Sequence, residues 1–293
     1  MLGQKSAFYE AKLGRMIDKL HLVSNNLLDP DWAHCLLQDL RKSVILDSMY
    51  QKCFEIKKNG KFIAAIKTRP RHENMNSLAI QLNPNSWEKF RELKCFISMF
   101  SNLEDVKISR IDHAVDVNIS LSNLLKQMRV RFKKINDQRC SITKNGNVVQ
   151  GVYFGSKLGP ELICIYDKAL EMKNRLGVYR KILDEPLGVK TRIEIRHTKN
   201  KIKVKKFFEL NKYKDISPFD CLEFMKISDE APNNKWKDLL FMHLEKDSLA
   251  EAYFYLNKNN NFKRDFGKYF YEPNIRQELD ESYRKKLEYF FSD

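Results

Sequence analysis

Residues 108–117 read ISRIDHAVDV, and this short stretch decides the fold. Its apolar and polar residues alternate, and side chains two positions apart lie on the same face of a β-strand. Ile111, Val115 and Val117 occupy one face, whereas Arg110, Asp112 and Asp116 occupy the other. The stretch is therefore predicted to be a strand with one apolar face for helices to cover and one face that carries two carboxylates and a guanidinium.

A second strand with the same pattern is predicted at residues 190–197, KTRIEIRH. Arg192, Glu194 and Arg196 share one face, opposite two isoleucines. Acidic residues are depleted in strands, so acids on two polar faces beside arginines require an explanation. Two interpretations stay open: a sheet surface held by cross-strand ion pairs, or a hard-cation site whose carboxylate oxygens suit magnesium or manganese.

The two histidines of these strands, His113 and His197, fall on the apolar faces by the same alternation. They are predicted to be packed core residues and not metal ligands. A β-bulge that turned one of them to the polar face would be the alternative.

A tyrosine nucleophile is predicted in residues 161–168, ELICIYDK. Alternation places Tyr166 on one face of this strand together with Cys164 and Lys168. A phenol has a pKa of about 10, so it attacks phosphorus only when its neighbours lower the cost of deprotonation. Lys168 and a metal on the adjacent phosphate oxygens would supply that help. Tyr153, in the stretch VYFGS, is the competing tyrosine.

The charge of the chain points to a polyanionic partner. The 293 residues carry a formal net charge of +15. Residues 190–214 include ten basic and two acidic residues, and residues 126–144 include seven basic residues and one acidic residue. Clustered Lys and Arg gain free energy by releasing counterions from a phosphate backbone. The clustering therefore favours nucleic acid over a charge excess that serves solubility alone.

The cysteine pattern and the hydropathy of the chain indicate the cellular compartment in which the protein works. The six cysteines are scattered without a paired CxxC spacing, which argues against structural zinc and against a disulfide scaffold. No run of 18 or more apolar residues occurs, so no membrane-spanning helix is predicted. Residues 1–20 show no signal-peptide core. We therefore expect a cytoplasmic protein with reduced thiols.

The pattern of elements predicts an α+β fold with a largely antiparallel sheet. Asn-Gly pairs at residues 59–60 and 145–146 predict tight hairpins. Apolar residues at helical spacing predict helices in the first fifty residues, over 121–135 and through much of the C-terminal part. The predicted parts are a helical N-terminal segment (1–50), a central sheet domain (51–210) and a helical C-terminal region (211–293).

Four blocks of the sequence, taken in order, resemble the Rep_trans-type rolling-circle replication initiators, a family that includes initiators of small plasmids and relaxases of integrative conjugative elements. The blocks are IQLNPNSWEKFRELKCFI (80–97), ISRIDHAVDV (108–117), GVYFGSKLGPELICIYDKALE (151–171) and KTRIEIRH (190–197). The resemblance implies a sheet of the rolling-circle nuclease (HUH-like) type with helices on one face.

The resemblance also implies site- and strand-specific DNA nicking and joining. In the family a tyrosine attacks a phosphodiester, stays linked to the 5′ phosphate and leaves a 3′ hydroxyl that primes synthesis. The nucleophile falls on Tyr166, and the acidic metal-site residues fall on Asp112 and Glu194. The implied cofactor is Mg²⁺ or Mn²⁺.

Further site residues follow from this implied chemistry. Asp116 matches the second aspartate of the family's strand and is the third candidate metal ligand. Arg110, Arg192 and Lys168 are predicted to stabilise the negative charge that develops on the phosphate.

The partner implied by the resemblance is the replication origin of a plasmid or other mobile element, single-stranded or melted at the nick site. Residues 121–135 and 199–214 are predicted to follow the phosphates, and the C-terminal region 211–293 is the candidate origin-binding part. A host helicase and a second copy of the chain are further candidate partners.

The chain departs from the family pattern at three places. Residues 156–160 read SKLGP where relatives often have arginine and serine, Cys164 stands where relatives have arginine, and Gln81 stands where some have glutamate. These departures keep a second interpretation open: a non-catalytic origin-binding or regulatory DNA-binding protein that retains the fold.

Overall fold

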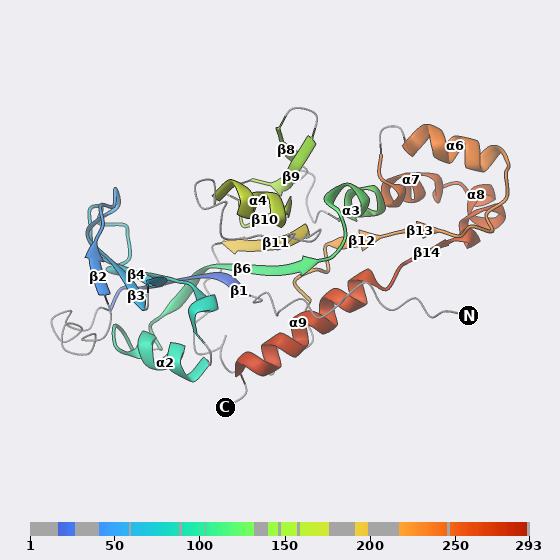
Figure 1. Cartoon of the computed structure of the whole chain (residues 1–293). Helices are drawn as coiled ribbons and strands as arrows, with labels where there is room; N and C mark the ends of the chain where they lie inside the picture. The colour runs from blue at the N-terminus through green and yellow to red at the C-terminus, as the bar shows by residue number, and fades with distance from the viewer. Residues whose placement is uncertain are drawn as a thin grey trace.

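The structure is a computed structural model of the chain, drawn in Figure 1. It describes residues 17–26, 41–58, 60–87, 90–102, 104–131, 140–145, 148–156, 159–175, 191–198, 217–244 and 247–291. Within these residues the chain has the predicted α+β fold, with a large antiparallel sheet and helices packed on it.

Ten strands of the described residues form the main sheet in the order β2-β3-β4-β5-β1-β6-β11-β10-β9-β8. Every pairing in it is antiparallel. The strands are β1 (Ile17–Ser24), β2 (Arg41–Val44), β3 (Tyr50–Lys58), β4 (Lys61–Pro70), β5 (Leu78–Leu82), β6 (Lys107–Val117), β8 (Cys140–Asn145), β9 (Val148–Gly155), β10 (Glu161–Asp167) and β11 (Thr191–Thr198). The stretch ISRIDHAVDV thus lies in β6, in the middle of the sheet.

The two predicted hairpins form where the Asn-Gly pairs stand. Strands β3 and β4 flank residues 59–60, and Gly60 has a φ of +75°, which glycine adopts without a steric penalty. Strands β8 and β9 flank residues 145–146. A third tight connection follows β9, where Gly155 has a φ of +100° and an added Cβ would lie 2.7 Å from the carbonyl oxygen of Glu161.

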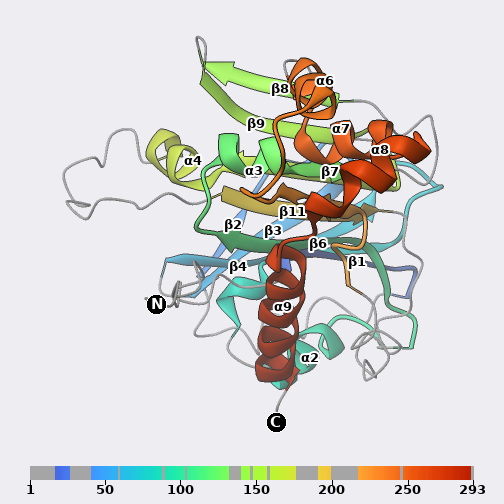
Figure 2. The same ribbon diagram turned by 90° about the vertical axis from the view of Figure 1, so that its right-hand side faces the viewer.

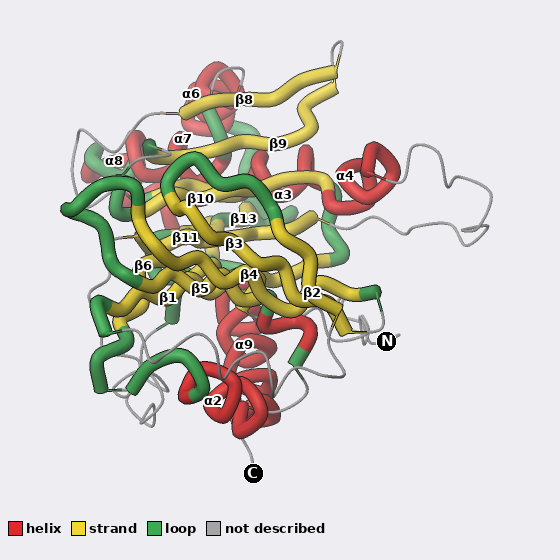
Figure 3. The backbone as a smooth tube through the Cα atoms, turned by 90° about the vertical axis from the view of Figure 1, so that its left-hand side faces the viewer, coloured by secondary structure: helices red, strands yellow, loops and turns green. Residues whose placement is uncertain are grey.

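Helices cover one face of the sheet. The core joins apolar side chains of the central strands, such as Val115 and Ile193, to Leu124 of α3 (Leu121–Gln127) and Leu279 of α9 (Ile275–Phe291). Figure 2 shows α3, α6, α7, α8 and α9 in front of the strands, and Figure 3, seen from the opposite side, shows strands in front. The predicted arrangement of helices on one face is confirmed, and the opposite face carries the polar side chains.

The histidine prediction is confirmed for His113 and holds in part for His197. His113 is buried on the apolar face, where its Nδ1 lies 2.6 Å from the hydroxyl oxygen of Tyr283 on α9. Burial lowers the pKa of His113 to about 3, so this imidazole is neutral. The ring of His197 packs edge-on against that of His113, and its Nδ1 lies 3.5 Å from Glu161 at the margin of the core.

The prediction of a helical N-terminal segment is wrong for its described residues. Both β1 and β2 are strands of the main sheet. The pairing of β1 with β6 shifts register between Ile17 and Lys19, so the buried residues Ile17 and Leu20 are three positions apart. A spacing of three imitates the helical period, and this β-bulge explains why the alternation of a strand was missed.

The predicted helix over 121–135 is also shorter than expected. Helix α3 starts at a Ser120 cap and ends at Gln127, after which Met128–Val130 form β7. Strand β7 pairs with β12 (Leu222–Phe224), so tertiary pairing takes these residues out of the helix. Residues 132–139 and 199–216, parts of the two predicted phosphate-tracking segments, lie outside the described residues.

The C-terminal part is divided between two cores. Phe219, Leu222 and Leu279 belong to the core of the main sheet, so a boundary at residue 211 does not separate two hydrophobic cores. A second core lies among α6, α7 and α8, around Phe262 and Phe266. The remaining elements are η1 (Pro84–Ser86), α2 (Phe90–Ser98), α4 (Lys168–Arg175), β13 (Lys226–Ile227), α6 (Lys235–Leu244), α7 (Leu249–Leu256), α8 (Asn260–Asp265), η4 (Gly267–Tyr269) and β14 (Phe270–Tyr271).

Two details of this part differ from the predicted helices. The helical pattern of KWKDLLFMHLEKDSLAEAYFYL (235–256) forms two helices, α6 and α7, because Ser248 and Glu251 form a capping box that starts a new helix. Ser217 and Pro218 open a turn that leads into β12 and do not start a helix. Among the described helices, none is both long and apolar enough to cross a membrane.

Candidate active site on the polar face of the sheet

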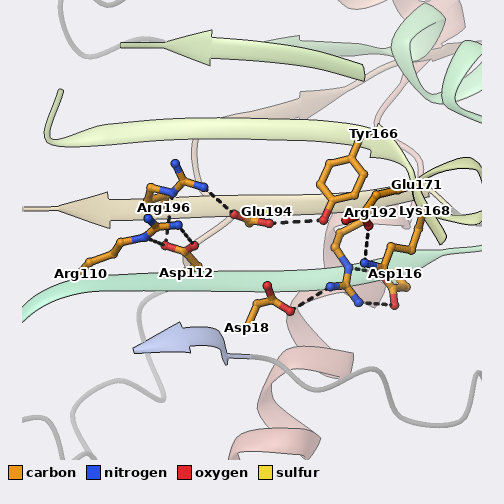
Figure 4. A network of polar contacts seen from close by, with 10 residues as sticks. All are labelled: Asp18, Arg110, Asp112, Asp116, Tyr166, Lys168, Glu171, Arg192, Glu194 and Arg196. Atoms are coloured by element: carbon orange, nitrogen blue, oxygen red, sulfur yellow. Dashed lines mark hydrogen bonds and ion pairs between the residues drawn. The ribbon is translucent and has the colours of Figure 1, made fainter. Parts of the chain in front are cut away.

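Three neighbouring strands, β6, β11 and β10, bring the predicted site residues onto one face (Figure 4). The register places Asp112 opposite Arg196 and Asp116 opposite Arg192. Arg192 in turn lies opposite Tyr166 on β10. The alternation in the sequence therefore predicted the shared face correctly, and the contacts divide it into two clusters.

The first cluster surrounds Asp112, whose side chain is completely buried. The guanidinium of Arg110 donates to both carboxylate oxygens of Asp112, with 2.7 Å between Nε and Oδ1. Arg196 lies on the other side, with its Nε 3.4 Å from Oδ1 of Asp112. It also donates from Nη2 to Oε1 of Glu194 over 3.1 Å. Two guanidiniums thus neutralise two buried carboxyl groups.

The carboxyl groups of Asp112 and Glu194 lie near enough to influence each other's pKa. Burial alone would raise the pKa of Asp112, but the hydrogen bond and charge of Arg110, with Arg196, lower it below its usual value. Burial and the negative charge of Asp112 raise the pKa of Glu194. Two adjacent carboxyls that share a site separate in this way, so Glu194 is the member that holds a proton more readily.

The second cluster surrounds Arg192, which is buried. Its Nε and Nη2 donate to the two oxygens of Asp116 over 2.6 Å and 2.9 Å, and its Nη1 donates to Asp18 on β1 over 3.0 Å. These carboxylates raise the pKa of Arg192 against the opposing effect of burial. Asp116 is thus an arginine partner in this structure, and its role as a metal ligand stays a prediction.

Tyr166 lies between the two clusters. Its hydroxyl donates to Oε2 of Glu194 over 3.4 Å, a long hydrogen bond. Burial and the charge of Glu194 raise the pKa of the phenol above its usual value. The competing Tyr153 lies opposite Cys164, one strand further from Glu194. Of these two tyrosines, Tyr166 is therefore the one that contacts the carboxyl pair.

Lys168 is at the start of α4, immediately after the strand. Its ammonium group forms an ion pair with Glu171, one turn along the helix. The same nitrogen lies 5.8 Å from the centre of the Tyr166 ring. Lys168 is thus close to the tyrosine, as predicted, but its charge is shared with a carboxylate of its own helix.

Three residues near the site were not assigned a role from the sequence. Asp18 was missed because β1 was predicted to be a helix. Arg196 was placed on the correct face, but only the fold shows that it reaches both Asp112 and Glu194. Gly151 lies opposite Tyr166 on β9, and an added Cβ there would lie 3.0 Å from the Tyr166 Cβ. A glycine inside a strand is the signal that could have identified this close approach.

The carboxylate oxygens of Asp112 and Glu194 are the candidate ligands of a metal ion. Among the described residues, no group of three or more His, Cys, Asp or Glu side chains is arranged to hold a metal ion. Mg²⁺ commonly binds proteins through one or two carboxylates and takes its other ligands from water and substrate phosphates. The adjacent oxygens of Asp112 and Glu194 fit that mode, with the two arginines as competitors for the same oxygens.

The fold and the site define an α+β protein with a tyrosine beside arginine-paired carboxyls on the polar face of an antiparallel sheet. No family model matches the chain, and no curated protein matches it. Among solved structures, the chain is similar to a rolling circle replication initiator protein from Geobacillus stearothermophilus. That match has 13% sequence identity and a TM-score of 0.43, and it covers 80% of this chain and 95% of the other. At this level of likeness the function has to be argued from the site.

Proposed function

We propose that the chain is a rolling-circle DNA replication initiator that nicks and rejoins one DNA strand through a 5′-phosphotyrosyl intermediate. The observation that supports this most directly is the hydroxyl of Tyr166, which is hydrogen bonded to Glu194 beside a row of guanidiniums. The four sequence blocks that resemble the Rep_trans-type initiators place the nucleophile at the same tyrosine.

The chemistry assigned to Tyr166 is an in-line displacement at phosphorus. The bond from the phenol oxygen to phosphorus forms and the bond from phosphorus to the 3′ oxygen breaks. The 3′ oxygen leaves with the bonding electron pair and takes up a proton from water, which gives the 3′ hydroxyl that serves as a primer. The phenol proton passes to the Glu194 carboxylate, to which the hydroxyl already donates. The phenol contacts Oε2 of Glu194, which leaves Oε1 for the second role proposed below for this carboxylate, as a cation ligand.

The arginines stabilise the charge that develops on the phosphate. Arg192 is held by Asp116 and Asp18 on the strand next to Tyr166, so its guanidinium is fixed before the DNA arrives. Arg110, at the other end of the row, donates to Asp112 and is not placed in advance in this way. Donors that are fixed in advance stabilise a transition state without reorganisation during the reaction.

Asp112 and Glu194 are the residues proposed to hold a divalent cation, Mg²⁺ or Mn²⁺. When bound there, such an ion would polarise the scissile phosphate. The polar face would accept single-stranded or melted origin DNA, because a stacked duplex constrains the backbone at the nick site. The net charge of +15 supports a polyanionic partner of this kind.

The proposal is tested with a supercoiled plasmid that carries the origin of the chain's own replicon, incubated with the protein and Mg²⁺. The expected product is a nicked circle with the protein linked through a tyrosine. Tyr166→Phe is expected to abolish this product and to keep DNA binding, whereas Tyr153→Phe is expected to keep both. Nicking that persists in Tyr166→Phe and is lost in Tyr153→Phe would move the nucleophile to Tyr153.

A non-catalytic origin-binding or regulatory DNA-binding protein is the second candidate function. The observation in its favour is that Arg110 and Arg196 occupy oxygens of Asp112 and Glu194. Under this hypothesis the carboxyls only anchor arginines that contact DNA. The plasmid experiment separates the two functions, because this candidate binds the origin but gives no tyrosine-linked product in the unmodified protein.

A further inference from the structure

We propose that Arg110 and Arg196 form a guanidinium lock, which holds the carboxyl pair of Asp112 and Glu194 until a divalent cation displaces it and releases the arginines to the scissile phosphate. The inference rests on the proposed function, since it takes the carboxyl pair as the metal site. It assigns to the two arginines a role that couples metal binding to DNA binding.

The first support is that the arginines use the oxygens a metal would need. Arg110 engages both oxygens of Asp112, and Arg196 lies against Oδ1 of Asp112 and donates to Oε1 of Glu194. A cation held by both carboxylates requires lone pairs that are now directed to guanidinium N–H groups. Metal and arginines therefore compete for the same positions.

The second support is the difference in burial within the lock. The side chains of Asp112 and Glu194 are 0% and 6% exposed, whereas those of Arg110 and Arg196 are 22% and 19% exposed. The carboxyls are thus fixed in the floor of the site, and the guanidiniums reach them from the solvent side. The arginines are therefore the more exposed members of the two ion pairs, and they are the ones proposed to move.

The third support is that Arg196, among the described residues, is hydrogen bonded through only one side of its guanidinium. Its Nε is buried and makes no hydrogen bond in the described part of the chain, although it lies 3.4 Å from Asp112. A buried donor without an acceptor is unfavourable. Arg196 therefore has an unfulfilled donor that a phosphate oxygen would satisfy after the metal has taken the carboxylates.

Release of the lock has a consequence for DNA. Guanidiniums bind phosphate through paired N–H donors, so each freed arginine is a ready-made phosphate ligand. Before release, their charge is largely cancelled by the two carboxyls. Metal binding would therefore add the charge of the ion to the face and, in addition, free paired guanidinium N–H donors for a DNA strand.

The experiment measures Mn²⁺ binding by electron paramagnetic resonance in the full chain without DNA. Arg110→Gln and Arg196→Gln are each expected to bind Mn²⁺ roughly tenfold more tightly than the unmodified protein, because one competing charge-assisted contact is removed. Asp112→Asn is expected to abolish the binding. Arg264→Gln, which removes an exposed arginine paired with Asp265, is the control and is expected to leave the affinity unchanged.

A second measurement follows the affinity for a single-stranded oligonucleotide by fluorescence anisotropy, with and without Mn²⁺. In the unmodified protein Mn²⁺ is expected to increase the affinity. In Arg110→Gln/Arg196→Gln this increase is expected to be largely lost, although the variant binds the metal more tightly. Arg110→Lys keeps the charge and is expected to give intermediate values, which provides a milder variant should the double one fold poorly.

The outcomes separate the lock from the metal site itself. Mn²⁺ that binds the unmodified protein but binds the arginine variants equally or more weakly would overturn the lock and leave the proposed function standing. No Mn²⁺ binding at Asp112 in any variant would overturn both the lock and the metal part of the proposed function. Opposite changes in metal affinity and DNA response would support the lock, because ion pairs with a purely structural role do not produce them.

Discussion

The hydroxyl of Tyr166 donates a hydrogen bond to the carboxyl of Glu194 on the neighbouring strand, over 3.4 Å. The protonation of each group affects that of the other. Burial and the Glu194 charge raise the pKa of the phenol, while burial and Asp112 raise the pKa of the carboxyl. The raised pKa of the carboxyl favours proton transfer from the phenol, whereas the raised pKa of the phenol opposes it. The proposed reaction therefore needs positive charge near the phenolate, from the arginines or a bound cation.

The first prediction concerns Glu194→Gln, which keeps the shape but removes the base. Nicking of a cognate plasmid is expected to fall by roughly 10²–10⁴-fold, the usual contribution of general acid–base catalysis. Glu194 is also a proposed cation ligand, so Mn²⁺ binding to Glu194→Gln is measured in parallel. Nicking that is lost while Mn²⁺ still binds would assign the loss to the missing base, and nicking that persists would show that another group is the base.

The second prediction concerns Arg192, which joins Asp116 and Asp18. Arg192→Met leaves two largely buried carboxylates without their guanidinium, and loss of one partner from such a buried ion pair costs about 3–5 kcal/mol. The free energy of unfolding, measured in urea, is expected to fall by roughly 3 kcal/mol. Arg192→Met/Asp116→Asn should recover part of the loss. Arg264→Met, at an exposed pair, should leave the urea midpoint unchanged.

The sequence was sufficient to predict which residues share a face of the sheet, but not which of them contact each other. Alternation in ISRIDHAVDV and KTRIEIRH assigned Arg110, Asp112, Glu194 and Arg192 to one face because a regular strand has a period of two. Period alone does not give register. The division into an Asp112–Glu194 cluster and an Asp116–Arg192 cluster depends on which strands are neighbours, and this is a property of the fold.

The N-terminal strand β1 shows why part of the site could not be predicted. Its bulge places buried residues three positions apart, and this local spacing is typical of a helix. Asp18 was therefore not predicted to lie on the sheet with the other site residues. The predicted length of helix α3 was wrong for a similar reason, since the pairing of β7 with β12 ends the helix early. In both places a contact between residues far apart in the sequence overrode the local preference.

The third prediction is a pH dependence of stability that arises at His113. Its pKa is lowered to about 3 in the folded chain, below the usual 6.5, so the unfolded chain binds the proton more readily. Stability from this group is therefore complete above about pH 6.5 and is lost as the pH falls through that value. From pH 7.5 to 5.5 the free energy of unfolding is expected to fall by roughly 1 kcal/mol from His113.

The control for this prediction is His113→Asn, which cannot titrate in that range. Its unfolding free energy is expected to be lower at pH 7.5, because the contact with Tyr283 is altered, but to change less between the two pH values. Tyr283→Phe removes only the hydroxyl and is expected to cost about 1 kcal/mol at pH 7.5. An equal pH response in His113→Asn and the unmodified protein would assign the effect to other groups, such as His21, whose pKa is lowered to about 4.

The last prediction concerns Gly151, which leaves space for the nucleophile. An added Cβ at this position would lie 3.0 Å from the Cβ of Tyr166 and 3.2 Å from Oγ1 of Thr143, so the larger Gly151→Val side chain must push the tyrosine aside. A displacement of about 1 Å at a reacting group can cost roughly 10²-fold in rate. Nicking is expected to fall by that order, while the affinity for origin DNA stays the same, because the arginines of β6 and β11 are untouched. Gly159→Val, in the turn before β10, is the matched control, and equal losses in both variants would show that the effect comes from general disruption of the sheet and not from the position of Tyr166.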